Sequence, residues 1–353
     1  MMCLEQVLRG RDYLPLRGRG EMKSLLEKYS YGVMPEEPVR VSGRVISRDE
    51  DICGGSAAEE RLEIKLEGGR GVFAFPASLY LPENRRRPPL VLHIAFRPVP
   101  DRYIPLDLIM ESGYALAVLV YTDIVNDDHF GDFSGGLAAY FGTASDRKRD
   151  EWGKIGMWAY GASRLMDYLQ TRDDIDTARS AVIGHSRLGK TALWCGALDE
   201  RFAAVISNDS GYGGAASSKH GSGERVSDFI EVGSWDWYCE NFKDLGGDME
   251  DRKPYDQSFL LAMICPRLLC VGSASLDRGA DPESEFLTTL HASKAWEDAG
   301  AKGLVCPDRM PQPGDRFFDG SVGYHLRAGE HSLTPDDWAA YIGFLDLKFG
   351  SAG

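Results

Sequence analysis

Residues 183–194 of this 353-residue chain read IGHSRLGKTALW, and this stretch fits two unrelated motifs. As Gly184-x-x-x-x-Gly189-Lys190-Thr191 it has the spacing of a phosphate-binding loop, in which backbone amides and a lysine hold nucleotide phosphates. As Gly184-His185-Ser186-Arg187 it has the form of a nucleophile elbow, a sharp strand-to-helix turn that carries a reactive serine. The two interpretations predict different chemistry, so the surrounding sequence has to decide between them.

The surroundings of the motif fit a phosphate-binding loop poorly. Such loops usually follow the first strand of their sheet and have a glycine-rich interior. Here two apolar strand-like runs come first, and the interior reads His-Ser-Arg-Leu. Asp209, after the run AAVISN, could still act as the magnesium-binding carboxylate of a nucleotide hydrolase. That function remains an alternative to the elbow.

Hydrophobic patterning around the motif predicts the fold. Continuous apolar runs at 90–96, 114–121, 178–186, 203–210 and 267–275 are typical of strands buried on both faces of a parallel sheet. Helical spacing lies between several of them, whereas the stretches 39–48, 60–68 and 72–82 alternate as antiparallel strands do. We therefore expect an α/β-hydrolase fold, a three-layer αβα sandwich with a mostly parallel, doubly wound sheet and antiparallel N-terminal strands.

One domain over residues 1–353 accounts for this order of elements. Residues 1–40 are expected to form a helical lead-in. The glycine-rich and aromatic-rich segment 211–258 is expected to be an insertion that lines the substrate site.

A serine nucleophile needs a base, which in this fold follows the acid and lies near the C-terminus. His331 comes just after the last strand-like run, so its side chain can reach over the serine. His325 alternates within that run and could be a core or substrate-lining residue, so His331 is preferred. Two carboxylates are candidates for the orienting acid, Asp277 after the run LLCVGSAS and Asp209 one strand earlier. Asp277 is preferred, and Asp209 is kept as a possible second acid.

The composition limits which binding partners and which cellular location are expected. A net charge of −14 argues against a nucleic-acid partner. No run approaches the roughly 20 apolar residues of a membrane span, and the N-terminus lacks the apolar segment of a signal peptide. A cytoplasmic protein is expected, or a secreted one if a signal was removed. The seven cysteines include no C-x-x-C pair, so we expect free thiols, with neither a metal nor an organic cofactor.

Several longer stretches match one family. The chain resembles the glucuronoyl esterases of carbohydrate esterase family 15, chiefly the bacterial members, from about residue 150 to residue 346. The matching stretches are GHSRLGKTALW, ALDERFAAVISNDSGYGGAA, YDQSFLLAMICPR, SASLDRGADPESEF, GYHLRAGEHSLTPDDW and, upstream, WAYGASRLMDYL. The family's G-x-S-R-x-G-K elbow places its glycine one position later than usual, as Gly189 does here. The segment RPVPDRY after the first apolar run departs from the family pattern.

The resemblance implies an esterase that cleaves the ester between glucuronic acid on xylan and an alcohol such as lignin. Ser186 would be the nucleophile and His331 the base. Arg187 would hold the oxyanion through its amide and its guanidinium. Lys190 would contact sugar hydroxyls, and Glu224 and Trp237 would line the sugar site.

Two other functions fit the same fold. A carbohydrate acetylesterase would use the same catalytic residues with a smaller acyl pocket. A catalytically silent binding module would keep the fold without turnover. For the esterase, the expected partner is a small-molecule or oligosaccharide uronate ester.

Overall fold

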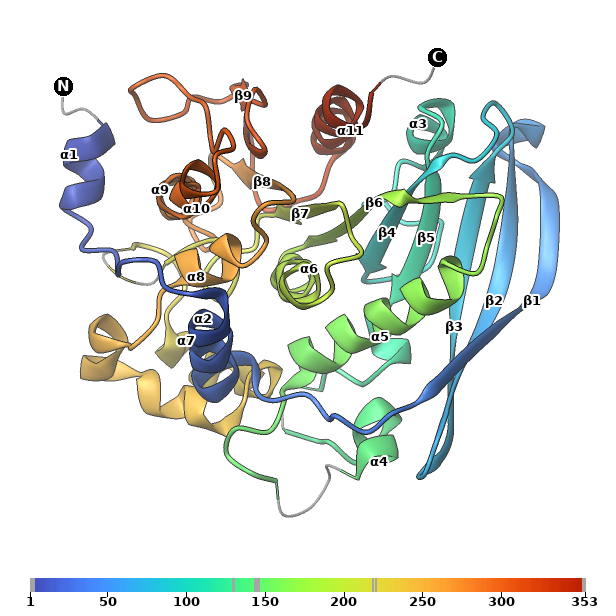
Figure 1. The fold of residues 1–353 in the computed structure, drawn as a ribbon, viewed down its shortest axis with the longest axis horizontal. Helices are drawn as coiled ribbons and strands as arrows, with labels where there is room; N and C mark the ends of the chain where they lie inside the picture. Colours follow the sequence, from blue (N-terminus) through green and yellow to red (C-terminus); the bar gives the residue numbers. More distant parts are fainter. Residues whose placement is uncertain (1–3, 129–130, 143–146, 218, 220, 351–353) are drawn as a thin grey trace.

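The computed structural model describes residues 4–128, 131–142, 147–217, 219 and 221–350, and a ten-stranded mixed sheet forms its centre (Figure 1). The strand order is β1-β2-β3-β5-β4-β6-β7-β8-β10-β9. Strands β5, β4, β6, β7, β8 and β10 run parallel to one another. Their bounds are β4 Pro89–Ala95, β5 Ala115–Val120, β6 Asp176–His185, β7 Ala204–Asn208, β8 Leu268–Ala274 and β10 Val322–Arg327. A two-residue strand, β9 (Arg316–Phe317), pairs antiparallel with β10 and ends the sheet.

The three alternating N-terminal stretches form the antiparallel part of the sheet, as predicted. Strands β1 (Arg40–Ile52), β2 (Ala57–Gly68) and β3 (Gly71–Pro82) extend the sheet beyond β5, on the right of Figure 1. Three arginines of β1 lie directly opposite three glutamates of β2 and form ion pairs with them: Arg40 with Glu67, Arg44 with Glu63, and Arg48 with Glu60. Cross-strand pairs of opposite charge stabilise the register of such a ribbon.

Helices cover both faces of the parallel strands, which confirms the predicted three-layer αβα sandwich and the α/β-hydrolase fold. One face packs against α5 (Lys154–Leu169), α6 (Arg187–Leu198), α8 (Gln257–Ala262), α9 (Pro282–Ala292) and α10 (Lys294–Asp298). The other packs against α3 (Leu106–Glu111) and α11 (Pro335–Phe349). Two separate apolar clusters result, one on each side of the sheet. Two short helices, α4 (Gly136–Phe141) and α7 (Val226–Glu231), lie in the connections.

The N-terminal lead-in packs onto the same core. It consists of α1 (Leu4–Arg9), α2 (Arg19–Leu26) and a π-helical turn at Glu27–Tyr31. Met22, Leu26 and Tyr31 are buried in the cluster that also holds α5 and α6. Further along the chain, two consecutive helices, α9 and α10, meet at Ser293. The Ser293 hydroxyl donates to the Leu290 carbonyl, and such a bond competes with helical pairing.

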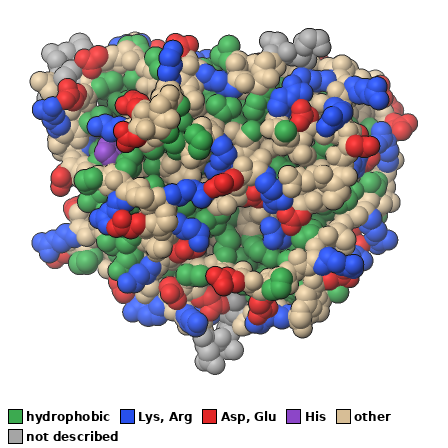
Figure 2. Space-filling view, viewed as in Figure 1, with side chains coloured by type: hydrophobic (Ala, Val, Ile, Leu, Met, Phe, Trp, Pro, Cys, Tyr) green, Lys and Arg blue, Asp and Glu red, His purple; other side chains and the backbone are tan. Residues whose placement is uncertain are grey.

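Charge is mixed over the face drawn in Figure 2. Acidic and basic side chains are interspersed among the residues shown there, so the excess of acidic residues is not gathered on this face. Within the described ranges, every helix is too short or too polar to cross a bilayer.

Candidate active site

Ser186 occupies a strand-to-helix turn, as the nucleophile-elbow interpretation predicts. Strand β6 ends at His185 and α6 begins at Arg187, so Ser186 alone makes the turn, with φ +58° and ψ −129°. Non-glycine residues seldom adopt a positive φ, and such strain is characteristic of functional positions. Because Ser186 precedes the first helical residue, its hydroxyl lies at the positive end of the α6 dipole.

The two glycines of the motif are needed for close packing, and they explain its shifted spacing. A Cβ atom on Gly184 would come within 2.0 Å of the Leu188 carbonyl oxygen, so a side chain there would collide with the backbone of the turn. A Cβ atom on Gly189 would come within 3.0 Å of the Ser210 Cβ and 3.1 Å of the Ser207 Oγ. Position 189, rather than 188, therefore faces the end of β7 and favours glycine.

Four predicted residues come together at the carboxyl edge of the sheet. Ser186 follows β6, Asp209 follows β7, Asp277 follows β8 and His331 follows β10. In parallel sheets the loops at this edge converge, so residues far apart in the sequence can meet.

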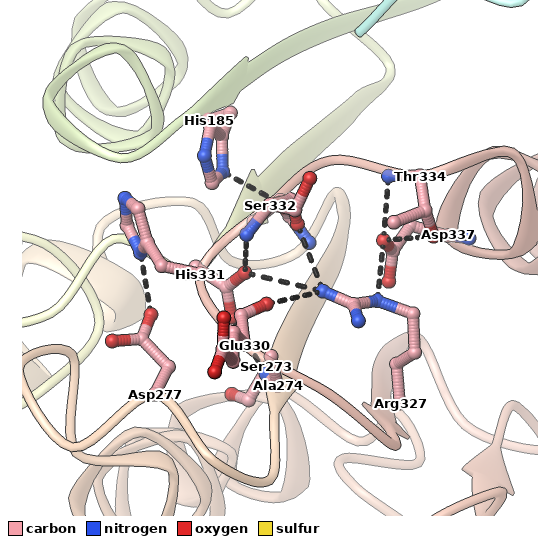
Figure 3. Close-up of polar contacts among 12 residues, drawn as sticks. His185, Ser273, Ala274, Asp277, Arg327, Glu330, His331, Ser332, Thr334 and Asp337 are labelled. Atoms are coloured by element: carbon pink, nitrogen blue, oxygen red, sulfur yellow. Dashed lines mark hydrogen bonds and ion pairs between the residues drawn. The ribbon is translucent and has the colours of Figure 1, made fainter. Parts of the chain in front are cut away.

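His331 is bound to Asp277. Its Nδ1 lies 2.5 Å from the Asp277 Oδ2 (Figure 3). The other carboxylate oxygen, Oδ1, accepts from the Ala280 backbone N–H at 3.1 Å. Burial alone would raise the pKa of Asp277. The hydrogen bond and positive charge of His331, together with the Ala280 amide, outweigh burial and bring that pKa below its usual range. Asp277 is thus an ionised acceptor for an Nδ1–H group.

Asp209 lies beside this pair; its carboxylate is hydrogen-bonded to backbone amides and lies 3.8 Å from the Arg327 guanidinium. It accepts from the Ala274 N–H at 2.6 Å and from the Ser332 N–H at 3.3 Å. Burial, followed by the negative charges of Glu285 and Asp277, raises its pKa well above the usual range. Asp209 therefore joins the backbones of the loops that follow β8 and β10. Of the two candidate acids, Asp277 is the one hydrogen-bonded to His331.

The other two histidines near the site are held in buried positions. His325 is buried in β10, with its Nε2 3.2 Å from Asp337 Oδ1. The Nδ1 of His185 lies 2.7 Å from the Asn208 Oδ1, and its ring packs against that of His331 with centroids 4.5 Å apart. Burial, then the charge of His331, lowers the pKa of His185 to about 3. His185 is therefore neutral and presents an uncharged ring to His331.

A cavity of about 410 Å³ opens above the serine. Its lining combines both predicted reactive side chains with aromatic rings and arginines: Phe96, Arg97, Arg102, Tyr103, Tyr121, His185, Ser186, Arg187 and His331. Residues 97–103 are the segment that departs from the family pattern, and Arg97, Arg102 and Tyr103 from it line the cavity. In the described part of the chain, Lys190, Glu224 and Trp237 do not line this cavity.

Arg187 connects the cavity to Trp237. Its guanidinium donates to Asp127 Oδ2 at 2.5 Å, and its Cζ lies 4.5 Å from the centre of the Trp237 ring. Asp127 also accepts from the Trp237 indole N–H at 2.7 Å and from the Tyr121 hydroxyl at 2.9 Å. Sequence reasoning missed Asp127 and Tyr121. The signal available for both was their position at and just beyond the carboxyl end of the buried strand at 114–121.

Lys190 is buried against Glu224. Its side chain is 3% exposed, and its ammonium donates to the Ser210 carbonyl at 2.7 Å and to Glu224 Oε2 at 3.2 Å. A phosphate-binding lysine has to point into an open loop, and this one points back toward the end of β7. The nucleotide interpretation has no geometric support at this position.

In the described part of the chain, one group of three side chains has possible metal-ligand atoms within 4.8 Å of one another. Its members are Asp209, Asp277 and His331. The hydrogen bonds given above account for their approach: His331 with Asp277, and Asp209 with two backbone amides.

Comparison with known proteins places the chain among enzymes of one family. The family model described as "Glucuronyl esterase, fungi" matches residues 64–300. Carbohydrate esterase MZ0003, from an unknown prokaryotic organism, is 33% identical over 367 residues, covering 93% of this chain and 83% of its own length. A solved glucuronoyl esterase from Solibacter usitatus superposes with a TM-score of 0.83 at 32% identity, covering 94% of this chain and 92% of that one.

Fungal relatives are more distant and longer. The 4-O-methyl-glucuronoyl methylesterase of Cerrena unicolor is 27% identical over 80% of this chain, which spans 57% of the length of that relative.

A second solved bacterial structure is also similar. It is a member of carbohydrate esterase family 15 from a marine bacterial metagenome, described as promiscuous, and it superposes with a TM-score of 0.83 at 33% identity. With a serine elbow, a histidine–carboxylate pair and these relatives, the chain belongs to the glucuronoyl esterase family, carbohydrate esterase family 15.

Proposed function

We propose that this protein hydrolyses glucuronoyl esters of carbohydrates, with Ser186, His331 and Asp277 as its catalytic triad. One observation carries the proposal: Ser186 and His331 line the same cavity, while His331 is hydrogen-bonded to the ionised Asp277. The names of the relatives give glucuronoyl esters as their substrates, and for the Cerrena unicolor relative the methyl ester of a 4-O-methyl-glucuronoyl group.

The geometry suits acyl transfer through a covalent intermediate. Ser186 Oγ attacks the ester carbonyl carbon while His331 Nε2 takes its proton, and Asp277 holds the Nδ1 proton and stabilises the imidazolium. The tetrahedral intermediate collapses, and the alcohol leaves with the proton from His331. Water then attacks the acyl-enzyme with His331 as base, which releases the uronic acid and restores Ser186.

Positive charge lies where the oxyanion forms. The backbone N–H of Arg187 is at the start of α6, where helical amides point outward toward the Ser186 turn. The Arg187 guanidinium is fixed by Asp127 and packs over the Trp237 ring, which leaves it little freedom to move away. The fixed guanidinium lines the cavity beside Ser186, where it would stabilise the negative charge that develops on the carbonyl oxygen.

The sugar would contact the segment 211–258, in keeping with its predicted role. Glu224 and Trp237 come from this segment, and both contact side chains of the elbow helix: Glu224 binds Lys190, and Trp237 packs on Arg187. The carboxylate of Glu224, whose side chain is 41% exposed, offers acceptors for sugar hydroxyls, whereas the buried Lys190 and Trp237 hold Glu224 and Arg187 in position.

Hydrolysis of a glucuronate benzyl ester by the wild type and Ser186→Ala tests the proposal, with 4-nitrophenyl acetate assayed beside it. Ser24→Ala, which changes an exposed serine of α2, is the control and should retain wild-type rates. We expect serine-dependent turnover of the uronate ester and weak acetate hydrolysis. Serine-dependent acetate hydrolysis alone would indicate an acetylesterase. Equal rates for the wild type and Ser186→Ala on both esters would refute an esterase function.

A further inference from the structure

Arg327 ends strand β10, and its buried guanidinium holds the backbone on both sides of His331 (Figure 3). One nitrogen, Nη2, donates to the Glu330 carbonyl at 2.9 Å and to the Ser332 carbonyl at 3.0 Å. The other terminal nitrogen, Nη1, donates to the Ala328 carbonyl at 3.0 Å. A single side chain thus satisfies three carbonyl groups within a five-residue loop, and His331 lies between two of them.

The guanidinium is itself anchored to the helix that follows the loop. Its Nε donates to Asp337 Oδ2 at 2.8 Å, and Asp337 is fully buried in the first turn of α11. Asp337 also accepts from the Thr334 N–H at 2.8 Å and from His325 Nε2 at 3.2 Å. Burial would raise the pKa of Asp337, but the bonds from His325 and Thr334 and the charge of Arg327 bring it below its usual range. Arg327 is therefore tied to an ionised carboxylate.

The loop backbone leaves room for this side chain. Gly329 has a φ of +127°, and a Cβ atom there would lie 2.5 Å from Arg327 Nη1. The guanidinium thus occupies the space that a side chain at position 329 would fill. The Gly329 carbonyl in turn accepts from the Leu276 N–H at 2.8 Å, one residue before Asp277. The loop that Arg327 holds is therefore bonded to the loop that carries the acid.

We propose that Arg327 is a positioning residue of the active site: its guanidinium fixes the backbone around His331 and so keeps the imidazole against Asp277 and within reach of Ser186. This role in turnover rests on the proposed esterase function. The planar guanidinium donates in several fixed directions at once, which a lysine ammonium cannot reproduce with the same geometry. Positioning by a second residue matters because a displacement of about 1 Å in a reacting group can cost on the order of 100-fold in rate.

The test uses Arg327→Lys, which keeps the positive charge beside Asp337 and loses the forked donors. We expect kcat on the glucuronate benzyl ester to fall roughly 10- to 100-fold, with KM within about threefold of the wild type. KM should be maintained because Arg187 and Trp237, the proposed acyl-side contacts, lie on other segments. His325→Gln is the matched control, because it changes another partner of Asp337 on the same strand and leaves the loop contacts intact.

A readout besides activity separates positioning from stability. The proton between His331 Nδ1 and Asp277 should give a downfield resonance in the proton NMR spectrum, assigned by its loss in Asp277→Asn. We expect the resonance to weaken or vanish in Arg327→Lys and to persist in His325→Gln, even where the two variants lose similar amounts of Tm.

Two outcomes would overturn the inference: a folded Arg327→Lys with wild-type kcat and an intact resonance, or equal losses of kcat and resonance in His325→Gln. If Arg327→Lys does not fold, Gly329→Ala displaces the guanidinium from the loop side, and its kcat, KM and resonance are compared with those of the wild type in the same way. If the wild type itself fails to hydrolyse the ester, the proposed function fails, and the resonance still decides whether Arg327 positions His331.

Discussion

Replacing Asp277 with asparagine tests whether its charge and geometry set the protonation of His331. In the native site the Ala280 N–H donates to Oδ1, and His331 Nδ1 faces Oδ2. In the variant the Ala280 N–H selects the amide oxygen for the Oδ1 position, so the amide NH2 turns toward His331. The imidazole then carries its proton on Nε2, where it cannot accept a proton from Ser186.

The magnitude follows from the lost charge. Two unit charges about 4 Å apart attract by about 4 kcal/mol at an effective dielectric of about 20. This screened value is appropriate because the His331 side chain is 44% exposed. Since about 1.4 kcal/mol corresponds to a factor of ten, the lost attraction for the imidazolium lowers kcat about 1,000-fold, and the wrong tautomer adds to the loss. We expect a loss in kcat of roughly 1,000- to 10,000-fold.

Asp209→Asn is the matched control, assayed by steady-state hydrolysis of the glucuronate benzyl ester at neutral pH. The hydrogen bonds of the Asp209 carboxylate are with the Ala274 and Ser332 amides, so an asparagine there leaves the His331–Asp277 bond in place. The oxygen of the asparagine amide can still accept from the Ala274 N–H, so we expect kcat to fall less than tenfold. A loss below tenfold in Asp277→Asn, or a larger loss in Asp209→Asn than in Asp277→Asn, would refute the assignment of Asp277 as the acid.

Three further variants test the elbow, the buried charge and the acyl contacts. Gly184→Ala should lower the free energy of unfolding in urea by about 2 kcal/mol or more, because its Cβ would meet the Leu188 carbonyl; an unchanged midpoint would contradict the packing argument. Burial raises the pKa of Glu285 to about 7 in the folded state, so the folded protein keeps a proton that the unfolded chain releases from about pH 4.5 upward. Wild-type stability should therefore fall relative to Glu285→Gln, by about 3 kcal/mol between pH 4.5 and 7, and parallel pH profiles of the two proteins would exclude this. Trp237→Phe loses the indole bond to Asp127 and should raise KM for the uronate ester roughly tenfold, with 4-nitrophenyl acetate as the insensitive control substrate.

The sequence predicts the residues at the carboxyl edge of the sheet because strand ends can be read from local patterns. His331 was preferred to His325 from its place beyond the last apolar run, and the structure buries His325 against Asp337. Asp277 and Asp209 could not be separated, since both follow adjacent parallel strands. Their roles depend on loop torsions that bring one carboxylate, and not the other, to His331.

Hydrophobic periodicity and motif spacing do not predict contacts between residues that are far apart in the sequence. Asp127 binds Arg187 from 60 residues away and Trp237 from 110 residues away, and its position just beyond a strand end does not identify either partner. Arg327 reads as an ordinary charged residue at a strand end. Its burial and its three carbonyl partners follow from the path of the next five residues, which periodicity does not describe.

The ion pairs along β1 affect how strongly the protein resists edge-to-edge aggregation. β1 is the long free edge of the sheet, and such an edge has unpaired backbone groups that a strand of another molecule can bind. Its arginines lie opposite glutamates of β2 in the native register, whereas a one-residue slip would bring Arg44 opposite Leu62 or Ile64 and separate the charges. A foreign strand approaching the edge would meet a row of charged side chains. The ribbon thereby carries its own protection against aggregation, and this protection weakens as added salt screens the charges.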